Sequence, residues 1–217
     1  MIVTIDGPAS SGKSTAARGL AQRLQFQFLD TGAMYRVVAL ACLQRSIDVT
    51  NTNAVAEVAE QVEITFPDGR VFAAGIDVTN AIRTPKITQA ASLVATNTNV
   101  RRELVCQQRK LAEGLNIVTE GRDQGTVAFP EAECKFYLTA DSQVRAHRRQ
   151  RDLNSNKQNV SLKEVITQLQ ARDQRDKNRF DSPLKPAEDA VQIDTTQLKP
   201  AEVLDVLEST IRQRLAD

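Results

Sequence analysis

Several residue types that often carry chemistry are scarce in this chain. It has no tryptophan, one histidine and three cysteines, and aromatic residues make up 4% of its 217 residues. A single histidine, His147, excludes catalysis that needs several histidines, and its arginine-rich surroundings favour a solvated helix residue. The cysteines at 42, 106 and 134 are odd in number and form no CxxC pair, so they indicate neither a disulfide framework nor a zinc site. We expect them to be buried thiols.

A strong net charge and long apolar runs are also absent. The formal charge of +1 gives no general attraction to nucleic acid or to acidic membranes. No apolar run reaches the roughly 18 residues that a membrane-spanning helix needs, and we expect no signal peptide because a strand is predicted from residue 2. A hydrophobic content of 41% suffices for a core. These features predict one domain over 1–217 in a cytoplasmic monomer that binds neither nucleic acid nor membrane.

The most specific motif present is a phosphate-binding loop. Residues 7–14 read GPASSGKS, which fits the pattern GxxxxGK[ST]. The glycines let backbone N–H groups turn toward phosphate oxygens, Lys13 reaches the β- and γ-phosphates, and the Ser14 hydroxyl is a ligand for Mg²⁺. A predicted strand at 2–6 precedes the loop and a predicted helix follows it, which is the required context. The chain is therefore expected to bind a nucleoside triphosphate.

Five short apolar runs, each ending in polar residues, are separated by helical patterns. They lie at 2–6, 26–30, 116–120, 135–138 and 190–194. This alternation is typical of a parallel sheet covered by helices on both faces. Ligands bind such sheets beyond the carboxyl ends of the strands. The polar segments 7–14, 31–36 and 121–126 follow three of the runs and are therefore candidate site segments.

Two regions depart from this rhythm. Residues 62–79 alternate around an Asp-Gly pair, which predicts a small antiparallel hairpin insertion. A helix is then expected to begin at Thr84 and Pro85 and to carry Ser92. Residues 152–160 are polar, rich in asparagine and without apolar period, which predicts a mobile loop between two helices.

A helix that starts at Ser161 changes character along one face. Ser161 and Glu164 form a capping box. The spacing of four and three residues then places one stripe on Val165, Leu169, Arg172, Asp176 and Arg179. Two readings are open: the helix leaves the core and enters a polar cavity, because burying unpaired charge is costly, or its charged end is solvated and forms ordinary ion pairs.

Arginines recur at the expected site edge. Arg36 lies in a helix that follows a tight glycine turn after the second strand, Arg122 follows the third strand, and Arg179 belongs to the charged stripe. The planar fork of guanidinium donors suits phosphate. One such arginine is most simply a surface ion pair, but three at this edge favour an anion site.

Four segments together resemble the bacterial cytidylate kinase family of P-loop nucleoside monophosphate kinases. They are the phosphate loop, 30–36 (DTGAMYR), 120–126 (EGRDQGT) and 172–179 (RDQRDKNR), and the resemblance runs over essentially the whole chain. It implies a P-loop NTPase fold, with a five-stranded parallel sheet flanked by helices, a small antiparallel NMP-binding insertion at about 62–95 and a short lid at about 148–160. It also implies transfer of a phosphoryl group from ATP to CMP or dCMP with Mg²⁺, in pyrimidine nucleotide metabolism. Thr31 and Glu120 stand where relatives often carry Ser and Asp.

The resemblance assigns roles residue by residue. The catalytic residues would be Lys13, Arg122 and Arg179, and Ser14 would be the metal ligand. Arg36, Arg122 and Arg179 would grip the acceptor phosphate, while Ser92, Arg101 and Asp123 would read the cytosine. Arg172 and Asp176 would hold the pentose, and Thr31 and Tyr35 would line the same site. ATP would be bound by Gly7, Pro8, Ala9, Ser10, Ser11, Gly12, Lys13, Ser14, Thr15 and Arg148. Whether Glu120 contacts a metal-bound water or an arginine is left open.

Three other interpretations compete. A related kinase could use UMP, dTMP, AMP or a small metabolite as acceptor. A P-loop protein could instead hydrolyse ATP slowly to control a partner, although such a switch needs no second set of phosphate-binding arginines. The basic stretch at 145–151 could bind RNA, but the near-zero net charge and interleaved acidic residues argue against that.

Overall fold

The computed structural model describes residues 1–155 and 159–216, the last two of these by their backbone only. The chain forms two compact units. Unit 1 consists of Met1–Phe28 and Leu115–Asp217, and unit 2 is Leu29–Gly114. Unit 2 contains the predicted insertion at 62–95 and extends beyond it on both sides. None of the helices in the described ranges has the length and apolarity needed to cross a membrane.

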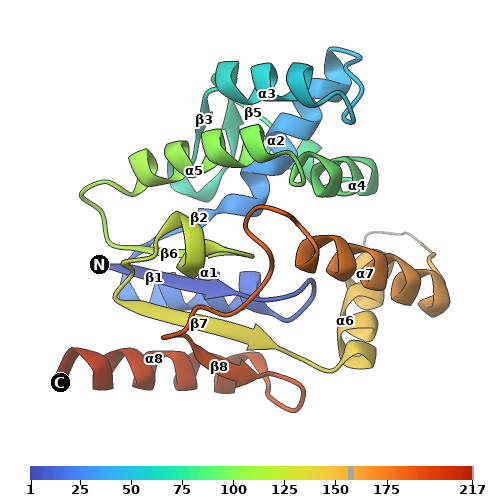
Figure 1. Ribbon diagram of the computed structural model, residues 1–217. Helices are drawn as coiled ribbons and strands as arrows, with labels where there is room; N and C mark the ends of the chain where they lie inside the picture. The colour runs from blue at the N-terminus through green and yellow to red at the C-terminus, as the bar shows by residue number, and fades with distance from the viewer. Residues whose placement is uncertain (156–158, 217) are drawn as a thin grey trace. The chain divides into compact units, whose positions relative to one another are not determined.

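A five-stranded parallel sheet organises unit 1 (Figure 1). Its strands are β1 (Ile2–Asp6), β2 (Gln27–Asp30), β6 (Ile117–Gly121), β7 (Cys134–Thr139) and β8 (Val191–Asp194), in the order β2-β6-β1-β7-β8. The last two residues of β2 already belong to unit 2. All five predicted strands are confirmed, each to within one residue at either end.

One face of this sheet is apolar. Alternate residues of β1, Val3 and Ile5, are fully buried in a cluster with Phe136 and Leu138 of β7. Helices α1 (Lys13–Leu24) and α8 (Pro200–Ala216) complete the cluster, with Leu20 the largest fully buried side chain of α1. The period of two in strands sends every second side chain to this face, which explains why these runs read as apolar.

The other face of the sheet is polar but also buried. Thr4, Asp6, Thr119 and Lys135 alternate with the apolar set, and each is less than a tenth exposed. They meet a single π-helical turn, η3 (Gln124–Ala128). Asp6 accepts hydrogen bonds from the backbone N–H groups of Gln124 (2.9 Å) and Gly125 (2.8 Å). The carboxylate of β1 therefore anchors the segment that follows β6.

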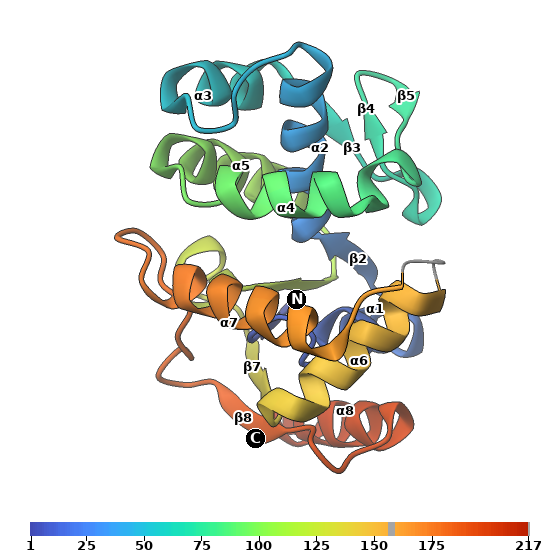
Figure 2. The ribbon, with the colours of Figure 1, turned by 90° about the vertical axis from the view of Figure 1, so that its right-hand side faces the viewer.

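Helices α6 (Ser142–Ser155) and α7 (Leu162–Lys177) pack against each other (Figure 2). The capping box of Ser161 and Glu164 is confirmed. The loop predicted at 152–160 is wrong at its start, since residues 152–155 are helical and Leu153 is buried in a cluster with Val165 and Leu169. Tertiary packing of that one leucine outweighs the poor helix propensity of its asparagine-rich neighbours. Residues 156–158 of the predicted loop and lid lie outside the described residues.

Unit 2 is built mainly from helices. These are α2 (Thr31–Gln44), α3 (Thr52–Gln61), α4 (Pro85–Val94) and α5 (Thr98–Ala112), with short 3-10 turns at η1 (Pro67–Gly69) and η2 (Ala81–Arg83). Buried aliphatic side chains from all four helices form one core. The predicted start of α4 is confirmed, because the Thr84 hydroxyl accepts from the N–H of Ile87 and Pro85 occupies the first turn.

The predicted hairpin has one strand more than expected. Strands β3 (Ile64–Thr65), β4 (Phe72–Ala73) and β5 (Ile76–Asp77) form an antiparallel sheet in that order. The Asp-Gly pair lies between β3 and β4 as predicted. The second turn, Ala74-Gly75, has φ of 47° and 77°, and such paired left-handed residues match the twist of a two-residue hairpin. Alanine in the first position concealed this turn in the sequence.

The expectation of three buried cysteines is wrong for one of them. Cys42 and Cys134 are buried, whereas Cys106 is exposed. Cys106 lies on α5 two positions after buried Leu104 and two before buried Gln108. On a helix these offsets turn its side chain away from the packed face.

The buried anchor Asp6 predicts a pH-dependent contribution to stability. Burial raises the pKa of Asp6 to about 7, despite the two backbone donors that oppose it. The folded protein thus holds this proton more tightly than the unfolded chain. The resulting stability is complete below about pH 4 and is lost as the pH rises to about 7. We expect the free energy of unfolding of the wild type, minus that of Asp6→Asn, to fall by roughly 3 kcal/mol over this range.

Urea unfolding of both proteins between pH 4 and pH 8 measures this difference. Because the other carboxyl groups titrate in both proteins, their contributions cancel. A difference in the free energy of unfolding that stays constant from pH 4 to pH 8 would contradict the raised pKa of Asp6.

Candidate active site

The phosphate loop between β1 and α1 is shaped by two glycines. Gly7 has φ of +149°, and a Cβ there would lie 2.1 Å from the carbonyl oxygen of Leu138. Gly12 has φ of +92°. Neither conformation suits a residue with a side chain, so the loop sequence is required by the backbone path. Lys13 then begins α1 directly after Gly12.

Lys13 is buried and is held by its own loop. Its Nζ donates to the Pro8 carbonyl oxygen at 2.9 Å and lies 4.0 Å from Oε2 of Glu120. Burial, reinforced by the positive charge of Arg122, lowers the pKa of Lys13 to about 7. The charged form of Lys13 is thus less favourable here than in water, and an anion beside it would stabilise that form.

Glu120 faces the phosphate loop. Ser14 Oγ donates to Oε1 of Glu120 at 2.8 Å, so this carboxylate contacts Ser14 as well as Lys13. A hydroxyl and a carboxylate side by side are the hard oxygen ligands that Mg²⁺ prefers. Within the described residues, no group of three or more His, Cys, Asp or Glu side chains gathers to hold a metal by itself. Mg²⁺ characteristically takes only one or two protein ligands and completes its shell with phosphates and water, so these two residues fit it.

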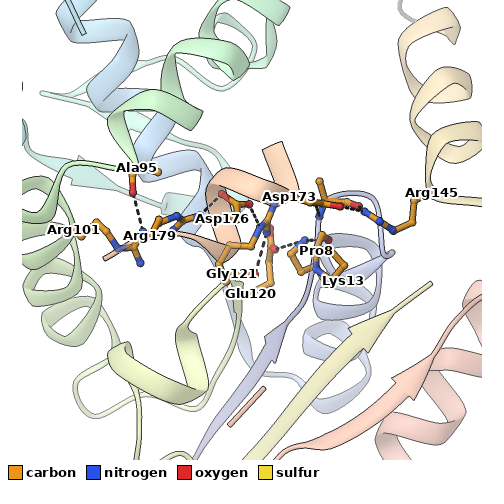
Figure 3. Close-up of polar contacts among 12 residues, drawn as sticks. Pro8, Lys13, Ala95, Arg101, Glu120, Gly121, Arg145, Asp173, Asp176 and Arg179 are labelled. Atoms are coloured by element: carbon orange, nitrogen blue, oxygen red, sulfur yellow. Dashed lines mark hydrogen bonds and ion pairs between the residues drawn. The ribbon is translucent and has the colours of Figure 1, made fainter. Parts of the chain in front are cut away.

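Asp176 joins Arg122 and Arg179, the two predicted phosphate-binding arginines of unit 1. Nε of Arg122 donates to its Oδ2 at 2.8 Å, and Nη2 of Arg179 donates to its Oδ1. The side chains of Asp176 and Arg179 are each 5% exposed. Burial alone would raise the pKa of Asp176, but Arg122, Arg179 and Arg172 hold it well below its usual range. Figure 3 shows the dashed contacts of Asp176, Glu120 and Lys13 in one view.

The charged stripe on α7 enters a buried polar region. Val165 and Leu169 pack in the core, while Asp173 and Asp176 farther along are also buried. The reading as a solvated helix end is therefore wrong. Arg179 is not on the helix, since α7 ends at Lys177 and Asn178 caps it. The chain turns after the cap and still brings the guanidinium of Arg179 to Asp176.

Two arginines of α6 reach the phosphate loop. Nη1 of Arg145 donates to the Ala9 carbonyl at 3.1 Å and to Asp173 at 2.5 Å. Arg148, which is predicted to bind ATP, lies close to Gly12: its Nη1 is 3.9 Å from the point that a Cβ would occupy on this glycine. The same guanidinium is bonded to the hydroxyl and carbonyl oxygens of Thr195.

Sequence reasoning missed Asp6, Asp173 and Thr195. Asp6 and Thr195 stand at the carboxyl ends of β1 and β8, which was a usable signal because ligands gather at that edge. Asp173 adjoins the predicted stripe without belonging to it, and only its partners reveal a role. His147 is exposed on α6, as predicted.

Unit 2 holds a separate set of predicted residues at the start of α2. Thr31, Tyr35 and Arg36 lie in its first turns. The expected glycine turn is wrong, because Asp30 caps the helix directly by accepting from the N–H of Ala33. The other oxygen of Asp30 accepts from Arg83 at 2.7 Å. Burial would raise the pKa of Asp30, but Arg83 and Arg36 lower it.

Ser92 and Arg101 are buried in unit 2, at 7% and 4% exposure. The guanidinium of Arg101 lies over the ring of Tyr35, 5.6 Å from its centroid, and Nη1 donates to the Ala95 carbonyl at 3.3 Å. The Ser92 hydroxyl has no hydrogen-bond partner within 1–155 and 159–216. In unit 1, Asp123 is 3% exposed and lies between Arg122 and η3. Of the predicted residues, Tyr35 and Arg101 meet in unit 2, and Arg122, Asp176 and Arg179 meet in unit 1.

Comparison with known proteins identifies the family. The sequence model of cytidylate kinase matches residues 3–213. A cytidylate kinase of Caldanaerobacter subterraneus subsp. tengcongensis is 44% identical over 211 residues, covering 97% of this chain and 94% of the relative. A bifunctional pantoate ligase/cytidylate kinase of a Synechococcus species is 45% identical and covers 99% of this chain. The chain spans 41% of the length of that longer protein.

A solved structure supports the fold alone. The match with a gluconokinase of Sinorhizobium meliloti 1021 covers 99% of this chain and 93% of the gluconokinase chain, with a TM-score of 0.51 and 13% identity. The parallel sheet flanked by helices, the phosphate loop after β1 and the family match over 3–213 agree with one another. The chain belongs to the cytidylate kinase family.

Proposed function

We propose that this protein transfers the γ-phosphoryl group of ATP to CMP or dCMP, giving ADP and CDP or dCDP. The observation that carries the proposal is the second set of buried cations. Arg122 and Arg179 share Asp176 within electrostatic reach of Lys13. An ATP switch needs only the phosphate loop, whereas a kinase for a phosphorylated acceptor needs a second phosphate-binding group.

The acceptor needs no general base. A phosphate monoester has its second pKa near 6, so it is already mostly a dianion at pH 7. The difficulty is to bring two polyanions together in line, and catalysis of this step is mainly positioning and charge neutralisation. This agrees with a chain whose one histidine is exposed on α6.

On the donor side, Lys13 exchanges the Pro8 carbonyl for the β- and γ-phosphates of ATP. Residues 7–15 line the same phosphates and, apart from Pro8, supply backbone N–H groups to them, and Arg148 lies over Gly12. Ser14 would hold Mg²⁺ directly, with Glu120 beside it. Bound Mg²⁺ neutralises charge on the β- and γ-phosphate oxygens.

On the acceptor side, Arg36, Arg122 and Arg179 bind the phosphate. Asp176 accepts from a pentose hydroxyl with Arg172 beside it, since a carboxylate has about four lone-pair sites and two are in use. Asp123 accepts from the cytosine amino group, and Ser92 and Arg101 bond the ring. The buried Ser92 hydroxyl and the stacking of Arg101 on Tyr35 support this reading. Thr31 lines the same site.

The proposal extends to the organisation of the chain. The insertion at about 62–95 belongs to the acceptor-binding part, and the segment at about 148–160 acts as the lid over ATP. Both would exclude water, which is a competing acceptor. On the composition given above, the protein works in the cytoplasm as a monomer in pyrimidine nucleotide metabolism.

The first prediction concerns acceptor choice. With Mg-ATP as donor, ADP formation should be confined largely to CMP and dCMP, and kcat/KM for UMP should be at least about 100-fold lower. Uracil replaces the amino donor by a carbonyl, which would face the Asp123 carboxylate, and a buried mismatch of this kind discriminates strongly. A coupled assay of ADP release with CMP, dCMP, UMP, dTMP and AMP measures this.

Asp123→Asn is the informative companion variant, because its amide can donate to the uracil carbonyl. The CMP/UMP ratio of kcat/KM should fall by about tenfold or more. Wild-type turnover of UMP at the rate of CMP would show that Asp123 does not read the base. ADP release that is indifferent to every acceptor would favour the ATP switch.

A second prediction concerns the shared carboxylate. Asp176→Asn leaves Arg122 and Arg179 without their common counter-charge, so both arginines lose their fixed position. We expect kcat/KM for CMP to fall about 100-fold or more while the KM for ATP changes less than about threefold. Removing one partner of a buried pair should also lower the free energy of unfolding by about 3 kcal/mol.

Asp205→Asn provides a matched control, because Asp205 pairs with Arg23 at an exposed site of unit 1. Exposed pairs contribute little to stability, so the free energy of unfolding and the kinetics of this variant should both stay close to those of the wild type. Wild-type kcat/KM for CMP in Asp176→Asn would remove Asp176 from the acceptor site.

A further inference from the structure

A threonine after the edge strand connects three parts of the donor site. Thr195 follows β8 directly and is 2% exposed. Its hydroxyl lies 2.9 Å from the carbonyl oxygen of Ser11 in the phosphate loop and 2.9 Å from that of Thr139 at the end of β7. Arg148 of α6 donates from Nη1 to the same hydroxyl at 2.9 Å and from Nη2 to the Thr195 carbonyl at 2.6 Å.

The sheet topology explains this meeting point. Strands β1, β7 and β8 are consecutive in the sheet and parallel. Their carboxyl ends therefore lie at one edge, where β1 continues into the phosphate loop. Thr139 pairs with Asp194, so Thr195 is the first residue beyond the ladder.

The hydroxyl has one proton to give and two carbonyls within reach. The Thr139 carbonyl already accepts from the backbone N–H of Thr195 at 2.8 Å. Directing the hydroxyl proton to Ser11 satisfies both carbonyls and leaves the oxygen lone pairs for the Arg148 guanidinium. The resulting order is Arg148 to Thr195 to Ser11, with each group donating to the next.

We propose that Thr195 is a positioning residue of the ATP site, which holds the phosphate loop at Ser11 and the Arg148 guanidinium in one arrangement. This inference rests on the proposed function, since it assigns ATP to that loop. Thr195 acts through Ser11 and Arg148 and need not touch the nucleotide. Its hydroxyl makes the loop ready for phosphate before ATP binds, so removing it raises the cost of ordering on binding.

The test compares Thr195→Val, which keeps the shape and loses the hydroxyl, with Thr195→Ser, which keeps the hydroxyl. Binding of Mg-ATP without acceptor is measured by titration calorimetry, and KM values are measured for ATP and CMP. Thr195→Val should weaken ATP binding about tenfold or more, because it loses a neutral hydrogen bond and a charge-assisted one. Its KM for CMP should change less than about threefold. Thr195→Ser should bind ATP within about threefold of the wild type.

Thr210→Val is the matched control, since the Thr210 hydroxyl donates to the Val206 carbonyl within its own helix α8. The ATP affinity of this variant should equal that of the wild type. If Thr195→Val does not fold, Thr195→Ala removes the same hydroxyl without adding an apolar group to the site. Unchanged ATP affinity in the folded Thr195→Val or Thr195→Ala variant would overturn the proposal. An equal weakening toward ATP and CMP that Thr195→Ser does not restore would overturn it too. Because ATP binding is measured without an acceptor, an acceptor other than CMP would refute the proposed function and leave this test intact.

Discussion

The interaction on which the site depends is the sharing of one buried carboxylate, Asp176, by Arg122 and Arg179. Guanidinium groups are costly to bury without a counter-charge, and Asp176 provides it for two at once. The positive charges of Arg122 and Arg172 act on Lys13, and the negative charges of Glu120 and Asp176 oppose them. Asp173 adds a further negative charge near Arg122. Burial is the main cause of the lowered pKa of Lys13, and the positive charge of Arg122 adds to it.

A buried cation of this kind lowers the stability of the empty protein and favours the binding of polyanions. The fold can hold it because the charges are distributed over rigid elements. Lys13 is the first residue of α1, Glu120 lies near the end of β6, and Asp176 lies in the last turn of α7. Asp6 holds the segment after β6 by accepting hydrogen bonds from two of its backbone N–H groups. The cationic groups are thus positioned in advance, which is the arrangement that makes electrostatic stabilisation effective.

Much of the fold was predictable because its signals are local. The five strands follow from short apolar runs, the start of α4 from Thr84 and Pro85, and the capping box from Ser161 and Glu164. The phosphate loop and the arginines at strand ends likewise follow from motif and position. Each of these depends on residues close together in the sequence.

The rest depends on contacts between distant segments. The π-helical turn η3 has no periodic pattern, and it forms where Asp6 and Gln124, far apart in sequence, meet. The continuation of α6 through residues 152–155 follows from Leu153 packing on α7. Arg179 leaves the helical stripe because α7 ends at Lys177, yet it reaches the same carboxylate. The place of Thr195 after a predicted strand marks it as a residue of the site edge, but its partners on β7, α6 and the phosphate loop are not indicated by its neighbours in the sequence.

The central claim is that the buried cations of unit 1 form an unneutralised oligophosphate site. Its most direct test is thermal unfolding in tripolyphosphate against sodium chloride at equal ionic strength, without nucleotide or Mg²⁺. A ligand at 100 times its Kd stabilises by about 2.7 kcal/mol, which should raise the unfolding temperature by about 5–10 °C for a chain of this size. Equal unfolding temperatures in the two salts would contradict the account, because the cations would then be neutralised already by the protein itself.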